Sequence, residues 1–168
     1  LASKFRPLGN RLAIITNGGG PGAMAADRAG DLGIPLAQLT NESMAVLNKA
    51  LPTAWSHSNP IDIGGDATPE RYREAILAVA QDPNVDSTLV MLSPQAMTDP
   101  MGVAQAIIEI SDQLKHTVIC CWMGEEQVAA SRRLLEDAGI PAFRMPETAI
   151  ELFHHISKYY RNQKLLLQ

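Results

Sequence analysis

Residues 11–27 read RLAIITNGGGPGAMAAD, and this stretch decides how the rest of the chain is interpreted. The apolar run at its start predicts a buried strand over 11–16. Four glycines and a proline then interrupt the pattern, and an alanine-rich segment predicts a helix. The turn between them suits a phosphate cradle, a dinucleotide fingerprint or a tight strand-to-helix connection, because glycine is permissive for all three.

The remaining apolar pattern alternates between short strand-like runs and longer amphipathic ones. Further strands are predicted over 36–39, 85–92, 117–122 and 142–145. Helix starts are predicted at Asn41, at Thr68 before Pro69 and at Asp99 before Pro100. This alternation predicts an α/β fold, a flavodoxin-like three-layer sandwich with a five-stranded parallel sheet of order 2-1-3-4-5. Ligands of such sheets bind beyond the carboxyl ends of strands one and three.

Composition limits the class of protein. The 168 residues are 46% apolar and 19% charged with a net charge of −4, which suits one soluble domain and no nucleic-acid partner. The apolar runs are strand-sized and the first ten residues lack a signal-peptide core, so we expect a cytoplasmic protein without membrane contact. The first residue is leucine and the last segment, YYRNQKLLLQ, lacks a packing pattern. We therefore expect residues 1–168 to be a single domain of a longer multidomain protein.

The glycine loop lacks what the nucleotide motifs require. A dinucleotide site needs an acidic residue at the end of strand two, where the chain reads AQLTN. A Walker loop needs lysine followed by Ser or Thr, and GGGPGAMA has neither. What remains is a helix N-terminus whose unpaired N–H groups attract an anion. The residues of this predicted phosphate site are Asn17, Gly18, Gly19, Gly20, Gly22 and Ala23. The alternative is a turn that only lets the helix pack tightly on the sheet.

Other polar and glycine residues are expected near the same edge of the sheet. The possible rim residues are Asn59, Asp62, Gly64, Gly65, Ser93 and Glu125. Four of them also have a structural interpretation: Asn59 as a turn cap, Gly64 and Gly65 as a close approach to a partner domain, and Glu125 as a first-turn acid.

Histidine and cysteine give no catalytic or metal site. His57 lies in a predicted loop and His116 at a predicted helix end, where a charged imidazole suits the dipole. His154 and His155 are consecutive on a helix, which is poor geometry for a shared metal. Cys120 and Cys121 are neighbours in a predicted strand and therefore point to opposite faces, as reduced core thiols. We expect no catalytic residue and no metal in this chain.

Several of these motifs together resemble a known family. RLAIITNGGGPGAMAAD at 11–27 and SNPIDIGGDATPERYREAILAVAQDPNVDSTLVMLSP at 58–94 are similar to the ligase domain of NDP-forming (ADP-forming) acyl-CoA synthetases, relatives of succinyl-CoA synthetase. The similarity extends from residue 11 to about residue 163. The closing ETAIELFHHISKYYRNQK, at 147–164, most resembles the synthetase-like region of Pat-type protein lysine acetyltransferases.

The resemblance implies a function for the glycine loop. In the family, phosphate passes from acyl phosphate through a phosphohistidine to a nucleoside diphosphate, and helix N-termini of two such domains hold the phosphohistidine. It implies that the amides of Gly19, Gly20, Gly22 and Ala23 form half of that cradle. The family's Ser-His-Thr-Gly-Ser type motif does not occur in this sequence.

The resemblance also implies partners outside this chain. We expect no cofactor in this domain, with CoA and ATP or ADP with Mg²⁺ bound by a CoA-binding and an ATP-grasp domain elsewhere in the parent. The isolated domain is expected to be inactive, and a homo-oligomer is possible. The alternative is a non-catalytic regulatory or oligomerising module fused to a GNAT acetyltransferase domain. Acyl group, nucleotide preference and oligomeric state stay open.

Overall fold

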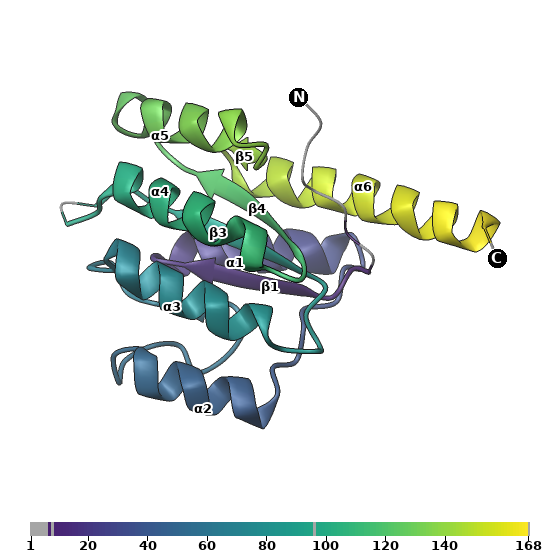
Figure 1. The fold of residues 1–168 in the computed structure, drawn as a ribbon, viewed down its shortest axis with the longest axis horizontal. Coiled ribbons are helices and arrows are strands. Elements are labelled where there is room, and N and C mark those ends of the chain that lie inside the picture. The colour runs from purple at the N-terminus through teal and green to yellow at the C-terminus, as the bar shows by residue number, and fades with distance from the viewer. Residues whose placement is uncertain (1–6, 8, 96, 168) are drawn as a thin grey trace.

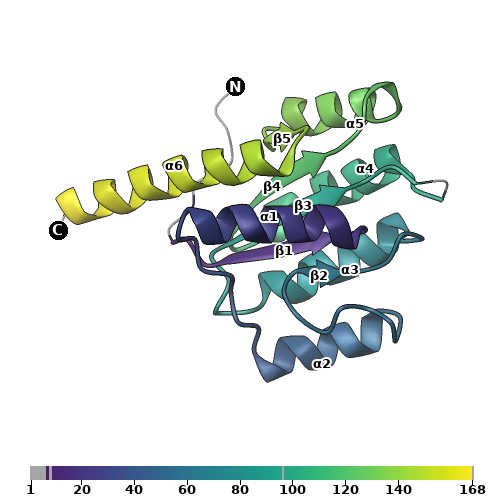
Figure 2. The ribbon, with the colours of Figure 1, turned by 180° about the vertical axis from the view of Figure 1, so that it is seen from behind.

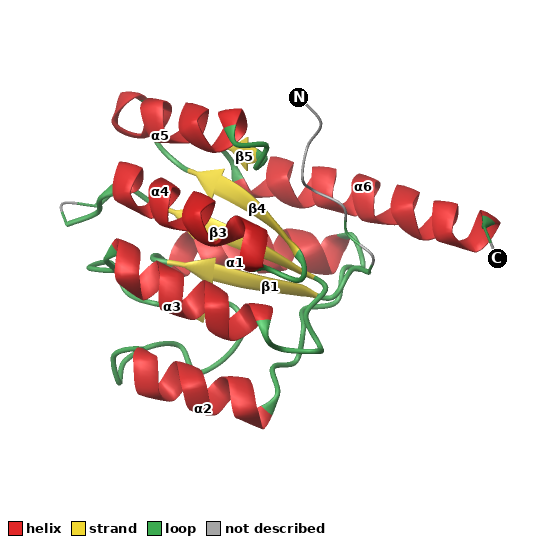
Figure 3. Cartoon of the chain, in the orientation of Figure 1, coloured by secondary structure: helices red, strands yellow, loops and turns green. Residues whose placement is uncertain are grey.

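A computed structural model describes residues 7, 9–95 and 97–167 of the chain. Strands and helices alternate along it, except that two helices follow the first strand, as Figures 1 and 3 show. The strands are β1 (Leu12–Thr16), β2 (Ile61–Asp62), β3 (Ser87–Leu92), β4 (Thr117–Trp122) and β5 (Ala142–Phe143). The helices are α1 (Gly19–Asp31), α2 (Asn41–Ala50), α3 (Pro69–Ala80), α4 (Pro100–Ile110), α5 (Glu126–Asp137) and α6 (Pro146–Leu166), with a short 3₁₀ turn at Ser111–Gln113.

The five strands form one parallel sheet of order β2-β1-β3-β4-β5, which confirms the predicted fold class and strand order. Helices α2 to α5 cover one face and α1 with α6 the other, as the two opposite views of Figures 1 and 2 show. Alternate residues of each strand enter the two cores because successive side chains point to opposite faces. Cys120 packs toward α2–α5 and Cys121 toward α1 and α6, both buried and free, as predicted.

The second strand differs from the prediction. Residues 36–39 make only an isolated parallel bridge between Leu36 and Leu12, and the strand beside β1 is Ile61–Asp62. Leu12 donates its N–H to the Pro35 carbonyl oxygen at 3.0 Å and accepts from Ala37 N–H at 2.8 Å. The chain then leaves the sheet. A four-residue apolar run of this kind is typical both of a strand and of a buried connection, so the sequence pattern does not distinguish the two.

The Asn59 side chain continues the edge of the sheet between these two segments. Its Oδ1 accepts from the Ile14 N–H at 3.0 Å. Its Nδ2 donates to the carbonyl oxygens of Leu12 at 2.9 Å and Ala37 at 3.0 Å. One amide therefore satisfies backbone groups that a longer second strand would otherwise pair.

In three helices the side chain of the N-cap residue accepts a hydrogen bond from a first-turn N–H group. The caps at Thr68 and Asp99 are confirmed, since their side chains accept from the N–H groups of Arg71 and Gly102. The cap of α2 is Thr40 rather than Asn41, because the Thr40 hydroxyl accepts from Ser43 N–H.

The fifth strand ends at residue 143 instead of residue 145, because Pro146 begins α6. The far end of that helix projects beyond the sheet in Figure 1. Among helices in the described part of the chain, none is both long and apolar enough to cross a membrane.

Candidate functional site

The glycine loop joins the carboxyl end of β1 to the N-terminus of α1. Gly18 is the N-cap residue, with φ −143° and ψ 129°, and no side chain caps the helix. Its N–H donates to Thr16 Oγ1 at 3.0 Å, and Pro21 has no N–H to donate. Gly22 donates to the Gly18 carbonyl oxygen at 3.2 Å. Within the described residues, the first-turn N–H groups of Gly19 and Gly20 are left without an acceptor.

This geometry corrects the predicted cradle. The N–H of Gly22 belongs to the helix ladder, and that of Ala23 lies beyond the four unpaired positions of a first turn. Gly22 instead serves packing, because a Cβ there would lie 2.9 Å from Thr16 Cγ2. A Cβ at Gly20 would meet nothing within 4 Å. The loop thus has features of an anion site and of a tight turn. Gly20 has open space and an unpaired N–H group, whereas Gly22 allows close packing on Thr16.

The Asn17 side chain is bonded to the protein backbone. Its side chain is 2% exposed, and its amide makes paired hydrogen bonds with the backbone of Ser93, where β3 ends. The Gln95 Nε2 donates to the Asn17 carbonyl oxygen at 3.4 Å. A Cβ at Gly65 would lie 2.6 Å from Gln95 Oε1. Gln95, which the sequence did not single out, therefore links the loops after β1, β2 and β3.

Asp62 lies beside the free donors. Its Oδ1 accepts from Gly64 N–H at 3.0 Å, and its Oδ2 would be 3.4 Å from a Cβ at Gly19. Gly64 has φ +96°, a conformation that favours glycine. Arg71 closes this turn by donating to the Ile63 carbonyl oxygen at 2.9 Å and pairing with Asp66 at 2.7 Å. The positive helix end thus faces one fixed carboxylate, with a guanidinium nearby.

Two predicted rim residues take other places. Asn59 lies within the edge of the sheet, with its amide bonded to backbone as described above. Glu125 is the N-cap residue of α5 and is exposed, and its N–H donates to Gln127 Oε1 at 3.1 Å. Of the rim residues, the structure therefore brings Asp62, Gly65 and Ser93 to the glycine loop, with Gly64 shaping the turn.

The histidines form no shared site. His57 Nδ1 lies 3.1 Å from Asn48 Oδ1 and its Nε2 lies 2.8 Å from the Thr53 carbonyl oxygen. His154 and His155 lie on α6 with ring centroids 5.7 Å apart. No group of three or more His, Cys, Asp or Glu suitable for a metal occurs among the residues that the structure describes.

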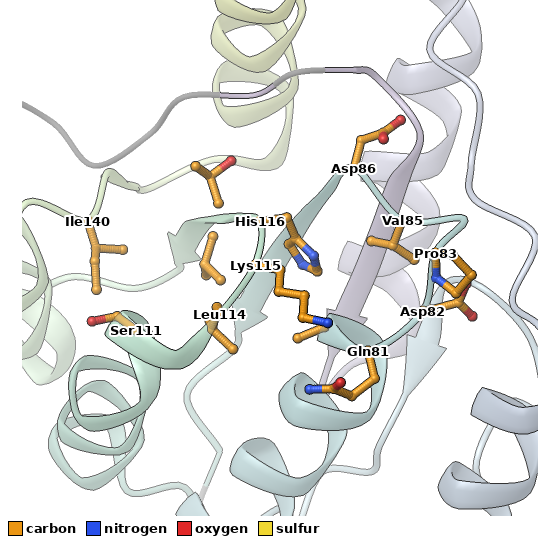
Figure 4. Close-up of a pocket in the computed structure, with 13 residues that line it drawn as sticks. Gln81, Asp82, Pro83, Val85, Asp86, Ser111, Leu114, Lys115, His116 and Ile140 are labelled. Carbon is orange, nitrogen blue, oxygen red and sulfur yellow. The ribbon is translucent and has the colours of Figure 1, made fainter.

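A hollow of about 560 Å³ lies at the opposite end of the strands from the glycine loop, near the amino ends of β3 and β4 (Figure 4). His116 lines it, from the segment between the 3₁₀ turn and β4 instead of the predicted helix end. Its Nε2 lies 2.7 Å from Thr88 Oγ1. Burial lowers the pKa of His116, although the charge of Asp86 opposes the shift. The environment therefore favours the neutral imidazole, whereas the predicted helix end would favour the charged form. The hollow lies far from the glycine loop across the length of the strands.

Comparison with known proteins gives a consistent picture. Residues 12–165 match the family model described as the Ligase-CoA domain. The chain is 38% identical over 159 residues to "Acetate--CoA ligase [ADP-forming] I" of Archaeoglobus fulgidus, an alignment that covers 95% of this chain and 22% of that protein.

Solved structures agree. PH0766 of Pyrococcus horikoshii OT3 has a TM-score of 0.87 and 29% identity, covering 93% of this chain and 37% of that one. The dinucleotide forming acetyl-coenzyme A synthetase 1 of Ca. Korarchaeum cryptofilum, in complex with phosphate and ADP, has a TM-score of 0.82 and 31% identity. That match covers 95% of this chain and 36% of the synthetase. The chain spans well under half the length of each of these proteins.

Proposed function

Because this chain belongs to the Ligase-CoA domain family, we propose that it holds a phosphoryl group during acyl-CoA, acyl phosphate and nucleotide exchange by an ADP-forming acyl-CoA synthetase. The observation that carries the proposal is the pair of free N–H groups of Gly19 and Gly20 at the uncapped N-terminus of α1. Glycine at position 20 also supports the proposal, because the space that a Cβ would occupy there is open and leaves room for an anion to approach the two N–H groups.

The contribution of the domain is electrostatic. A helix N-terminus carries roughly half a positive charge, and its N–H groups stabilise a phosphoryl group as negative charge develops on it. The hydrogen bonds between Asn17 and Ser93 fix the loop that presents these donors. Asp62 acts in the opposite direction, because its carboxylate repels a phosphate unless the group arrives with a proton or a cation. We infer that this repulsion helps the phosphoryl group to leave.

The rest of the reaction lies outside this chain. We propose that residues 1–168 are one domain of a longer protein, which supplies the phosphorylated histidine, a CoA-binding domain and an ATP-grasp domain that binds ATP or ADP with Mg²⁺. The low coverage of the relatives supports this, since 95% of the chain aligns with 22% of the Archaeoglobus protein. The isolated chain should show no acyl-CoA ligase turnover. The matches give no support to the alternative of a regulatory module in a Pat-type acetyltransferase.

Phosphate titration of the ¹⁵N-labelled chain tests the proposal. At millimolar phosphate we expect the amide signals of Gly19 and Gly20 to shift. Gly20→Val places a side chain in the open space in front of these donors and should weaken binding at least tenfold. Gly30→Val is the matched control, because Gly30 lies on the same helix and a Cβ there would also meet nothing within 4 Å. Phosphate shifts that are absent, or equal in both variants, would overturn the proposal.

A further inference from the structure

A second polar hollow lies at the edge of the sheet beside β5. Its volume is about 420 Å³, and it is bounded by α5, by β5 and by the start of α6. These three elements lie together in Figure 1. Three arginines line it: Arg132 and Arg133 from α5 and Arg144 from the segment after β5. In the described part of the chain none of the three forms an ion pair.

Arg132 is the unusual member of this set. It is only 6% exposed, and its Nη1 is buried without a hydrogen-bond partner among the described residues. A buried guanidinium donor without an acceptor destabilises a fold, and more than a neutral donor does because the group is charged. Arginine is otherwise almost never buried unless it is paired. Arg132 also lines the hollow, and the described residues supply no hydrogen-bond acceptor to its Nη1.

The N-terminus of α6 opens on the same hollow. Its N-cap residue is Met145, which provides no side-chain cap, and Pro146 at the first helical position has no N–H. The helix ladder begins with Ala149, whose N–H donates to the Met145 carbonyl oxygen at 3.2 Å. The N–H groups of Glu147 and Thr148 are thus the unpaired first-turn donors. Met145 and Thr148 both line the hollow.

We propose that this hollow binds the phosphate group of a small molecule, held by Arg132 and Arg144 and by the N-terminus of α6. Arginine suits this ligand because its planar fork donates two parallel hydrogen bonds to phosphate oxygens. A volume of this size accommodates a small ligand as well as a free ion. β5 is three strands from β1 in the sheet, so the hollow lies roughly 14 Å from the glycine loop. The site is therefore independent of the proposed cradle.

Two carboxylates lie at or near the hollow. Glu136 is among the lining residues, where it opposes three positive charges. Glu147 has a buried Oε2 without a partner among the described residues, and it raises the pKa of Cys121 while Arg132 lowers it, so both groups lie near that thiol. Both buried atoms lack a partner in this part of the chain, so Arg132 and Glu147 do not satisfy each other. Within the described residues, Glu147 therefore leaves the Nη1 of Arg132 without an acceptor.

The test uses the ¹⁵N-labelled chain titrated separately with inorganic phosphate and with ADP. We expect shifts of the Glu147 and Thr148 amides, which are read independently of Gly19 and Gly20, so this site can fail while the cradle stands, or the reverse. Arg144→Ala should weaken binding here about tenfold, since a hydrogen bond to a charged group is lost. Arg132→Lys keeps the charge but loses the fork and should also weaken it. Lys158→Ala is the matched control, an equal loss of charge about 18 Å along α6.

The two probes separate the sources of the phosphate. Shifts with both probes, or with either alone, support the site and identify whether a free ion or a nucleotide fills it. Shifts with neither, or shifts that Arg144→Ala leaves as strong as Lys158→Ala does, overturn it. Glu147→Gln adds a further readout: the proposal expects tighter phosphate binding, because a repelling charge is removed. A fall in stability with no change in binding would instead identify Glu147 as an internal partner of Arg132 and overturn the proposal.

Discussion

Asn17 and Ser93 exchange two hydrogen bonds across the carboxyl edge of the sheet, each 2.8 Å long. Asn17 Nδ2 donates to the Ser93 carbonyl oxygen, and Ser93 N–H donates to Asn17 Oδ1. The backbone pairing of β1 with β3 ends at Thr16 and Met91. The Asn17–Ser93 pair extends it by one step, with the side-chain amide of Asn17 in the place of a backbone peptide group. It lies at the point where the strand order reverses, which is where open α/β sheets bind ligands. The glycine loop therefore begins from a fixed position.

Asn17→Ala should destabilise the chain by about 2 kcal/mol, because two partly buried backbone groups of Ser93 lose their partners. Urea denaturation followed by circular dichroism measures this. Asn162→Ala on the exposed face of α6 is the control and should change the free energy of unfolding by less than about 0.5 kcal/mol. Equal stabilities of the two variants would show that the pair does not hold the loop.

The glycines of α1 should respond differently to alanine. A Cβ at Gly22 would lie 2.9 Å from Thr16 Cγ2 and 3.6 Å from Pro60 Cβ, so Gly22→Ala should destabilise by about 1–3 kcal/mol. Gly20 and Gly30 face open space, and alanine there should stabilise by up to about 1 kcal/mol, since glycine loses more conformational entropy in a helix. Thermal unfolding of the three variants checks the order. A Gly22→Ala variant as stable as Gly20→Ala would contradict the packing role.

The sequence predicted the layers and the strand order because buried parallel strands leave a strong signal. The runs that became β3 and β4 contain four and five consecutive apolar residues and are covered on both faces. The prediction of the second strand was wrong because β2 has only two residues, too few for a recognisable strand pattern. The buried residues Ile61 and Ile63 also lie in a segment rich in turn residues, which is typical of a loop. The pairing of β2 depends on the Asn59 amide, a long-range contact that no local pattern contains.

The candidate site was predictable in position but not in its donors. Unpaired N–H groups at a glycine-rich helix start follow from the order of residues alone. Which of them stay free depends on Thr16 and on the point where the ladder begins, and both are properties of the folded chain. The three arginines beside β5 left no signal at all. Arg132 and Arg133 lie eleven or more residues from Arg144, and only the edge of the sheet brings them together.

The two cysteines should resist alkylation in the folded chain. Burial raises the pKa of Cys120 well above its ordinary value, and burial, with Glu147 adding to it, raises the pKa of Cys121 to about 12. Only the thiolate is nucleophilic, so iodoacetamide at pH 8 should label neither residue until urea unfolds the chain. Mass spectrometry of trypsin fragments reads both sites. Rapid labelling of either thiol without urea would contradict the packing on that face of β4.

Asp82 should make the chain sensitive to acid. Burial alone would raise the pKa of Asp82, but hydrogen bonds from the Ser43 hydroxyl, from the N–H groups of Thr40 and Asn84 and from the Thr40 hydroxyl outweigh it and lower this pKa. A carboxylate whose folded pKa is depressed stabilises the fold above its unfolded pKa, about 3.9, and loses that contribution as the pH falls through the folded value.

Asp82→Asn should therefore lower the free energy of unfolding at pH 7 by about 1–3 kcal/mol, because an uncharged amide cannot accept as strongly from these donors. It should also reduce the difference in stability between pH 6 and pH 3. Asp86 keeps part of that difference, because hydrogen bonds and charge from Arg11 hold its pKa down against the effect of burial. Urea denaturation at the two pH values measures both effects. Asp27→Asn, which removes an exposed carboxylate on α1, is the control for the loss of one negative charge. An Asp82→Asn variant that keeps the full difference would show that the charge of Asp82 does not stabilise the turn between α3 and β3.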